Sequence, residues 1–201
     1  MKQLITLLFT AFSLVATAQV TTLTPGSPAP DFTLENVDGK TVSFNTMGPC
    51  KGYIVVFTCN TCPVARGYEQ RIIALNAKYA PLGFPVIAIN PNDPDLTPGD
   101  SYDKMVEKAK TNGYTFPYLF DKGQVTTNAY GARNTPHIFL VKHTGTGNII
   151  VYTGAIDNDP EDTRTDKKKY LEDALSAVMN GKDPATPTTK AIGCSIHRRH
   201  A

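Results

Sequence analysis

An apolar run near the middle of the first half constrains the fold of this chain more than any other feature. Residues 52–58, GYIVVFT, are continuously apolar and β-branched, which is typical of a central strand buried on both faces. Large side chains then recur every three or four residues from Val64 to Tyr79, which predicts an amphipathic helix that ends at Pro81. Residues 84–90 read as a second buried strand. Strand, helix and strand in this order require a parallel pair joined by a right-handed crossover.

The remaining segments complete a mixed sheet. Residues 31–44 predict a β-hairpin around the turn Asp38-Gly39, and residues 137–155 predict two antiparallel strands joined by a Gly/Thr turn. The other expected elements are a helix at 101–113, a short strand at 118–121, a short helix at 124–131 and a last helix at 166–181. We therefore expect an α/β fold, with a central mixed sheet flanked by helices and an added N-terminal hairpin.

The N-terminal residues are typical of a secretory signal peptide. Lys2 precedes an apolar run, and residues 16–18, Ala-Thr-Ala, form a small-residue cleavage site before Gln19. The alternative, an uncleaved anchor helix, would need about 20 apolar residues, and two threonines and a serine interrupt this run. We expect bacterial-type export to the periplasm or the exterior, without stable membrane insertion after cleavage.

Length and composition favour one globular domain. The 201 residues are 41% hydrophobic, and 20 basic against 18 acidic residues leave a net charge of +2. No basic stripe with interleaved aromatic residues is present in the sequence, so we expect no nucleic-acid partner. The expected division is a signal peptide at 1–18, a linker at 19–28, the domain at 29–183 and a C-terminal tail at 184–201.

Four cysteines define the chemistry that is available: Cys50, Cys59, Cys62 and Cys194. In an oxidising compartment thiols tend to pair, and four cysteines allow three full pairings. Adjacency makes Cys59–Cys62 the first choice. That choice leaves Cys50–Cys194 as the favoured second pair.

Cys59 lies where the buried strand gives way to the helix. The unpaired N–H groups and the positive end of the helix dipole should favour its thiolate, which is the reactive form. Cys62 follows one turn later, and Pro63 suits the first turn because its missing N–H would have had no partner. The spacing therefore predicts a thiol that attacks a disulfide and a second thiol that resolves the mixed disulfide.

Two other interpretations of the Cys59–Cys62 pair are weaker. A structural zinc site needs a second ligand pair, and the sequence has no second CxxC; His197 and His200 stand alone at the chain end. A purely structural disulfide would close so small a ring that it would remove little chain entropy. We expect no metal and no cofactor.

Residues 133–139, RNTPHIF, form a second candidate site. Pro136 opens a strand, where proline is tolerated in the ordinary trans form. A cis bond between Thr135 and Pro136 would be a deliberate feature. The residues alone favour the trans form.

Taken together, these motifs resemble the thioredoxin superfamily. The hairpin segment 28–44, the motif FTCNTCP at 57–63 and the motif IGCSI at 192–196 are similar to its extracytoplasmic alkyl hydroperoxide reductase/thiol-specific antioxidant (AhpC/TSA) branch. The resemblance implies a thioredoxin-like fold, with Cys59 as nucleophile and Cys62 as resolving cysteine. It also implies that Thr135 and Pro136 form a cis-proline loop that faces the cysteines and pairs with an extended substrate chain.

The sequence departs from the better-known branches of the superfamily. Thr58 stands in the place of the thioredoxin tryptophan, and Asn60-Thr61 separate the cysteines. The peroxiredoxin signature, proline, then threonine four residues later, then cysteine three after that, also fails. Counted back from Cys59, its threonine and proline positions hold Val56 and Gly52.

Three further residues are candidate auxiliaries. Arg133 could place a cation near the thiolate, and His137 could tune Cys59 or, with both cysteines, bind copper, although copper-delivery relatives carry three residues between their cysteines. Cys194 has three interpretations: a partner of Cys50, a third redox thiol that relays to Cys59, or a free thiol.

We therefore predict an exported thiol–disulfide oxidoreductase that cycles between dithiol and disulfide. Its partners would be protein or small-molecule disulfides and thiols, together with a redox protein that donates or accepts electrons. The alternatives are a thiol-dependent peroxidase and, less favoured, a copper-binding chaperone module.

Overall fold

The structure, a computed structural model, describes residues 20–199; the expected signal peptide lies outside the described residues. In chain order the strands are β1 (Leu34–Asn36), β2 (Thr41–Val42), β3 (Gly52–Phe57), β4 (Val86–Asn90), β5 (Tyr118–Phe120), β6 (Asn134–Thr135), β7 (His137–Thr144), β8 (Gly147–Gly154) and β9 (Cys194–Ser195). The α-helices are α1 (Pro63–Tyr79), α2 (Tyr102–Asn112), α3 (Val125–Tyr130) and α4 (Tyr170–Met179). Three short 3-10 helices are η1 (Phe44–Thr46), η2 (Ala80–Leu82) and η3 (Pro98–Asp100).

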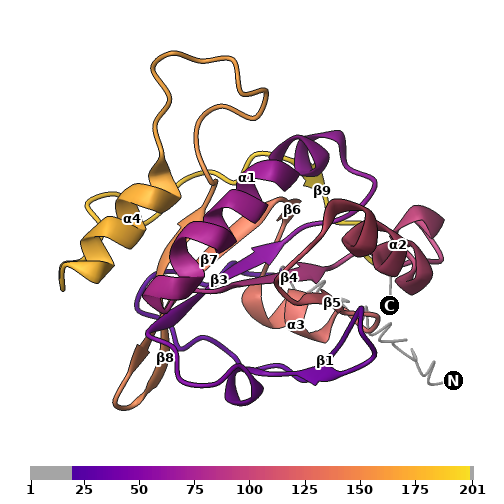
Figure 1. The fold of residues 1–201 in the computed structure, drawn as a ribbon, viewed down its shortest axis with the longest axis horizontal. Coiled ribbons are helices and arrows are strands. Elements are labelled where there is room, and N and C mark those ends of the chain that lie inside the picture. Colours follow the sequence, from indigo (N-terminus) through magenta and orange to yellow (C-terminus); the bar gives the residue numbers. More distant parts are fainter. Residues whose placement is uncertain (1–19, 200–201) are drawn as a thin grey trace, which may run out of the picture.

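Seven strands form one mixed sheet in the order β2-β1-β5-β4-β3-β7-β8 (Figure 1). The central strand β3 pairs in parallel with β4, and β4 pairs in parallel with β5. On its other side β3 pairs antiparallel with β7, which continues into β8. The predicted mixed sheet, the parallel crossover and the N-terminal hairpin are confirmed. The two-stranded pair β6–β9 was not predicted.

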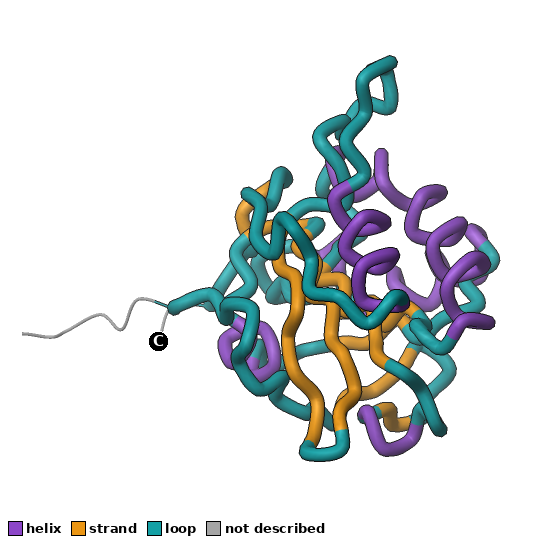
Figure 2. Tube along the Cα trace, turned by 90° about the vertical axis from the view of Figure 1, so that its left-hand side faces the viewer, coloured by secondary structure: helices purple, strands orange, loops and turns teal. Residues whose placement is uncertain are grey.

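Alternating side chains of the central strands build a core on each face of the sheet, because successive strand residues point to opposite faces. Ile54 and Val56 face the core shared with α1, α2 and α4. Val55 and Phe57 face the second core, which includes Tyr130 of α3. The longer helices accordingly lie together on one side of the strands (Figure 2).

Both chain ends of the described region pack against this framework. Residues 20–28, expected as a linker, run beside α3 and β8: the Leu23 N–H donates to the Tyr130 carbonyl at 3.0 Å, and the Gly26 N–H donates to the Ile150 carbonyl at 2.8 Å. Beyond residue 184 the chain passes the end of β8, where the Thr189 N–H donates to the Thr153 carbonyl at 3.0 Å, and its strand β9 then pairs with β6. Within residues 20–199, no helix is long and apolar enough to cross a bilayer.

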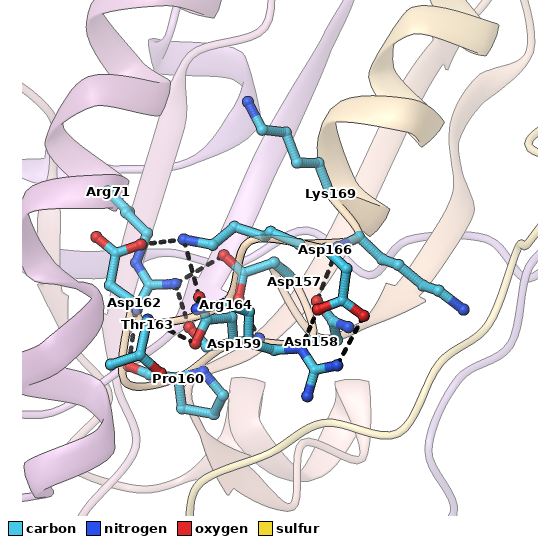
Figure 3. Close-up of polar contacts among 12 residues, drawn as sticks. Arg71, Asp157, Asn158, Asp159, Pro160, Asp162, Thr163, Arg164, Asp166 and Lys169 are labelled. Carbon is cyan, nitrogen blue, oxygen red and sulfur yellow. Dashed lines mark hydrogen bonds and ion pairs between the residues drawn. The ribbon is translucent and has the colours of Figure 1, made fainter.

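The loop between β8 and α4 braces the helix that starts at the CxxC motif (Figure 3). Arg71 of α1 donates to the Asp157 carboxylate at 2.7 Å and to the carbonyls of Asp159 and Pro160 at 2.6 and 2.8 Å. Tyr68 of α1 also donates to Asp157, at 2.8 Å. Helix α1 is therefore held to this loop through one buried carboxylate.

The chain offers a matched test of this brace. The side chains of Arg71 and Asp157 are 18% and 4% exposed, whereas those of Arg164 and Asp166 are 47% and 69% exposed. We expect Arg71→Ala to lower the free energy of unfolding in urea by about 3 kcal/mol, because it leaves a buried carboxylate without its cation. Arg164→Ala should change it by less than about 1 kcal/mol. If the two substitutions lowered the free energy of unfolding equally, the contact between Arg71 and Asp157 would not be the stabilising interaction described here.

Candidate functional site

The two cysteines of the CxxC motif lie in the connection between β3 and α1. Cys62 is the N-cap of α1, and its Sγ accepts a hydrogen bond from the Ala65 N–H at 3.5 Å. The Cys62 N–H in turn donates to the Cys59 Sγ at 3.4 Å. Cys59 and Cys62 are 3% and 4% exposed. The first turn of α1 therefore donates a hydrogen bond directly to the Cys62 sulfur. Cys59 lies earlier in the chain, in the turn that connects β3 to α1.

The disulfide of this site joins Cys62 to Cys194, with their Cα atoms 5.9 Å apart. The first-choice pair Cys59–Cys62 is therefore wrong for this state, and so is the pair Cys50–Cys194, because Cys50 and Cys59 are free. Cys50 is half-buried and its thiol points to the Met47 carbonyl at 3.9 Å. The observed bond closes a loop with a sequence separation of 132. In the chain-entropy view, a loop of that length contributes about 4 to 5 kcal/mol to stability.

The bond between Thr135 and Pro136 is cis, as the resemblance implied. The Thr135 hydroxyl hydrogen-bonds the Cys59 Sγ at 3.2 Å. The Thr135 carbonyl oxygen lies 3.2 Å from the Cys62 Sγ. The predicted site residues Cys59, Cys62, Thr135 and Pro136 are thus brought together, and Thr135 contacts both sulfurs.

A buried carboxylate, which the sequence analysis missed, holds the two residues between the cysteines. Asp100 is fully buried and accepts hydrogen bonds from the Asn60 N–H at 2.6 Å and the Thr61 hydroxyl at 2.7 Å. The side-chain amide of Asn92 donates to it at 2.8 Å, and that of Asn90 at 3.3 Å. The signal in the sequence was the Asp- and Pro-rich segment after the second buried strand, which reads locally as an exposed loop.

The environment of Cys59 raises the pKa of its thiol. Burial is the main cause, and the negative charge of Asp100 adds to it. The hydrogen bond to Thr135 and the N–H groups of Cys62 and Thr61 act in the opposite direction and are outweighed. The expectation of a pKa lowered by the helix start is therefore wrong in sign, because desolvation of the thiolate exceeds the stabilisation by these donors.

His137 and Arg133 are engaged elsewhere. The His137 Nδ1 accepts a hydrogen bond from the Arg133 N–H at 3.3 Å, and its Nε2 contacts the Thr153 hydroxyl at 3.2 Å. Burial, with the Arg133 charge as a lesser cause, lowers the pKa of His137 to about 4, so the ring is neutral at pH 7. The exposed Arg133 guanidinium donates to the Val20 carbonyl at 3.1 Å. These hydrogen bonds join both side chains to groups other than Cys59, and their role as auxiliaries stays a prediction.

Among residues 20–199, no group of three or more His, Cys, Asp and Glu side chains is arranged to hold a metal ion. A copper site formed by Cys59, Cys62 and His137 is therefore not assembled. One sulfur of that set is also bonded to Cys194.

The site opens to solvent through a cleft of about 320 Å³. Cys59, both members of the Cys62–Cys194 disulfide and Thr135 line it, with Asn92 on the facing loop. A free thiol, a disulfide and Thr135 of the cis-proline loop therefore line the same cleft. This arrangement supports exchange between a thiol and a disulfide.

Comparison with known proteins agrees with this chemistry. The model of the AhpC/TSA family matches residues 25–151. The thiol-disulfide oxidoreductase ResA of Halalkalibacterium halodurans is 29% identical over 131 residues, which are 65% of this chain and 69% of that protein.

Solved structures share the fold of this chain. A hypothetical protein from Sinorhizobium meliloti 1021 is 31% identical with a TM-score of 0.82, over 90% of this chain and 98% of that one. A putative thiol:disulfide interchange protein DsbE from Chlorobium tepidum is 23% identical with a TM-score of 0.55, over 66% of this chain and 85% of that one. The last likeness confirms a thioredoxin-like fold.

The charge of Asp100 should be visible in the titration of Cys59. In a Cys50→Ser protein whose Cys62–Cys194 bond is intact, Cys59 is the one remaining thiol. We expect Asp100→Asn to lower the Cys59 pKa, because it removes a negative charge that opposes the thiolate. Alkylation by iodoacetamide at pH 7 should then be about two- to tenfold faster, since one pKa unit changes the thiolate fraction about tenfold.

The matched control is Asp103→Asn, an exposed carboxylate in the first turn of α2, which should leave the rate unchanged. A pH profile of alkylation that is unchanged, or shifted upwards, in Asp100→Asn would show that the carboxylate does not act on Cys59.

Proposed function

This chain belongs to the AhpC/TSA family, and we propose that it is an exported thiol–disulfide oxidoreductase in which Cys59 attacks and Cys62 resolves. One observation carries the proposal: the free thiol of Cys59 lies beside a disulfide and against the hydroxyl of Thr135 in a single cleft. The ResA name of the related proteins supports the same activity.

The reaction proceeds from the fully reduced protein. The Cys59 thiolate attacks one sulfur of a substrate disulfide, that S–S bond breaks, and the other half of the substrate leaves as a thiolate and takes up a proton. The Cys62 thiolate then attacks the Cys59 sulfur and expels the remaining half of the substrate. Two electrons pass to the substrate and a Cys59–Cys62 disulfide remains. A redox protein restores the dithiol, and the same steps in reverse oxidise a substrate dithiol.

The surroundings of Cys59 limit how much thiolate forms at neutral pH but leave that thiolate strongly nucleophilic. Its raised pKa keeps most of the group as thiol at neutral pH, and the thiolate that does form is a strong nucleophile, because nucleophilicity rises with pKa. The Cys62 N–H and the Thr135 hydroxyl both contact the Cys59 sulfur. These two groups are placed to stabilise negative charge when Cys59 serves as the leaving group.

Export and the division of the chain are part of the same proposal. The signal-like residues 1–18 support secretion to the periplasm or the exterior, and the Pro/Thr-rich segment 184–201 supports a separate C-terminal tail. Expression of the full chain in a bacterium should yield a periplasmic protein whose measured mass begins at Gln19. A cytoplasmic protein with an intact N-terminus would contradict export.

The peroxidase alternative has less support. The peroxiredoxin threonine and proline are absent from the sequence around Cys59. The cation proposed to activate the thiolate, Arg133, donates to the Val20 carbonyl instead. We therefore expect slow consumption of hydrogen peroxide in comparison with reduction of a disulfide.

Removal of single thiols tests the proposal. Cys59→Ser should reduce the turnover of insulin disulfide reduction by at least about a hundredfold, because it removes the attacking sulfur. Cys50→Ser is the matched control: it removes a half-buried thiol outside the cleft and should retain wild-type turnover. If Cys59→Ser retained activity, the assigned nucleophile would be wrong. If the wild type consumed peroxide faster than it reduced insulin, the peroxidase would be the better assignment.

A further inference from the structure

The C-terminal tail occupies the edge of the cis-proline loop. We call residues 193–199 the docked tail. Its strand β9 pairs antiparallel with β6, so that Ser195 lies opposite Asn134 and Cys194 lies opposite Thr135. An extended chain with a cysteine thus already lies where the proposed function requires a substrate chain. In Figure 1, β9 lies beside the start of α1.

Gly193 fits this edge because it has no side chain. A Cβ on Gly193 would lie 2.1 Å from the Thr135 carbonyl oxygen and 3.0 Å from the Pro136 nitrogen. The Asn134 side-chain amide donates to the Gly193 carbonyl at 3.0 Å. So close an approach of two backbones requires glycine.

The residues after Cys194 bind further along the same surface. The Ile196 N–H donates to the Arg133 carbonyl at 3.1 Å, and its side chain, 8% exposed, joins the second core. The His197 N–H donates to the Asn92 side chain at 3.0 Å. The Arg199 guanidinium pairs with Asp93 at 2.5 Å. The docked tail is therefore held by backbone, apolar and ionic contacts as well as by its disulfide.

We propose that Cys194 is a third redox-active cysteine, presented on a tethered internal substrate that accepts the disulfide from Cys59–Cys62. The inference rests on the proposed function and extends it by one step. The Cys194 thiolate attacks the Cys62 sulfur, the Cys59–Cys62 bond breaks, and Cys59 leaves with the electron pair. Cys59 then takes up the proton that Cys194 gave up, so the exchange needs no further oxidant or reductant.

The observed state is the product of this step. The protein holds one disulfide, at Cys62–Cys194, while Cys59 is again a thiol. The Thr135 hydroxyl bonds Cys59 and its carbonyl oxygen touches Cys62, so one residue contacts both the sulfur that leaves and the sulfur that is attacked. In this state the docked tail covers the substrate edge. Reduction of Cys62–Cys194 by the redox partner removes the covalent tie and returns both cysteines to thiols.

The experiment starts from the fully reduced full-length chain and adds oxidised glutathione. Samples are quenched with acid over time, free thiols are alkylated, and disulfides are assigned by peptide mass mapping. In the wild type we expect glutathione on Cys59 first, then Cys59–Cys62, and finally Cys62–Cys194. Cys194→Ser should attach glutathione at the wild-type rate and stop at Cys59–Cys62.

A substitution that keeps every cysteine separates docking from thiol chemistry. Gly193→Ala should lower the final ratio of Cys62–Cys194 to Cys59–Cys62 by at least about tenfold, because its methyl group overlaps the Thr135 carbonyl. Gly145→Ala, in the turn between β7 and β8 with nothing within 4 Å of the added carbon, is the matched control and should behave as wild type.

Each outcome decides between the two claims. A wild type that stops at Cys59–Cys62, or a Cys59→Ser variant that forms Cys62–Cys194 at the wild-type rate, overturns the relay and leaves the proposed oxidoreductase intact. A wild-type ratio in Gly193→Ala overturns the role of the docked tail. If glutathione never attaches to Cys59, the proposed function itself fails.

Discussion

The bond between Cys62 and Cys194, with the strand pair beside it, is the constraint on which the rest of the site depends. It ties the first turn of α1 to the end of the described chain. The same contact brings β9 onto β6, beside Thr135, whose hydroxyl contacts the Cys59 sulfur and whose carbonyl oxygen contacts the Cys62 sulfur. Without this contact the tail would not line the cleft. With it, the tail becomes a wall of the cleft that contains Cys59.

Burial has the largest effect on the pKa of Cys59 in this cleft. Cys59 has several neighbouring donors that favour its thiolate, yet its pKa is raised, because the thiolate loses more hydration than these donors restore. Asp100 adds its charge while holding Asn60 and Thr61 in place. One buried carboxylate thus both holds the turn between the cysteines and opposes the thiolate form of Cys59. The docked tail and Asp100 together leave Cys59 buried, with a raised pKa, beside the Cys62–Cys194 disulfide.

Much of the fold could be predicted from sequence because its signals are local. The apolar run at β3, the helical repeat of α1 and the Asp38-Gly39 turn each specify an element within a few residues. The partner of Cys62 could not be predicted in this way, since it depends on where a segment 132 residues away returns. Asp100 was missed for a related reason: its burial follows from the packing of η3 under the CxxC turn. The direction of the Cys59 pKa shift was predicted wrongly. The sequence shows that Cys59 precedes a helix, which favours the thiolate, but it does not show how strongly the folded protein buries the thiol.

The central claim concerns which cysteine stays free when the protein is oxidised, and peptide mapping of the air-oxidised chain under non-reducing conditions measures that directly. Alkylation of the native protein before digestion marks the free thiols. The account predicts a fragment pair joined through Cys62 and Cys194, with the alkyl label on Cys59 and Cys50. A dominant Cys59–Cys62 bond with the label on Cys194, or a bond between Cys50 and Cys194, would contradict it.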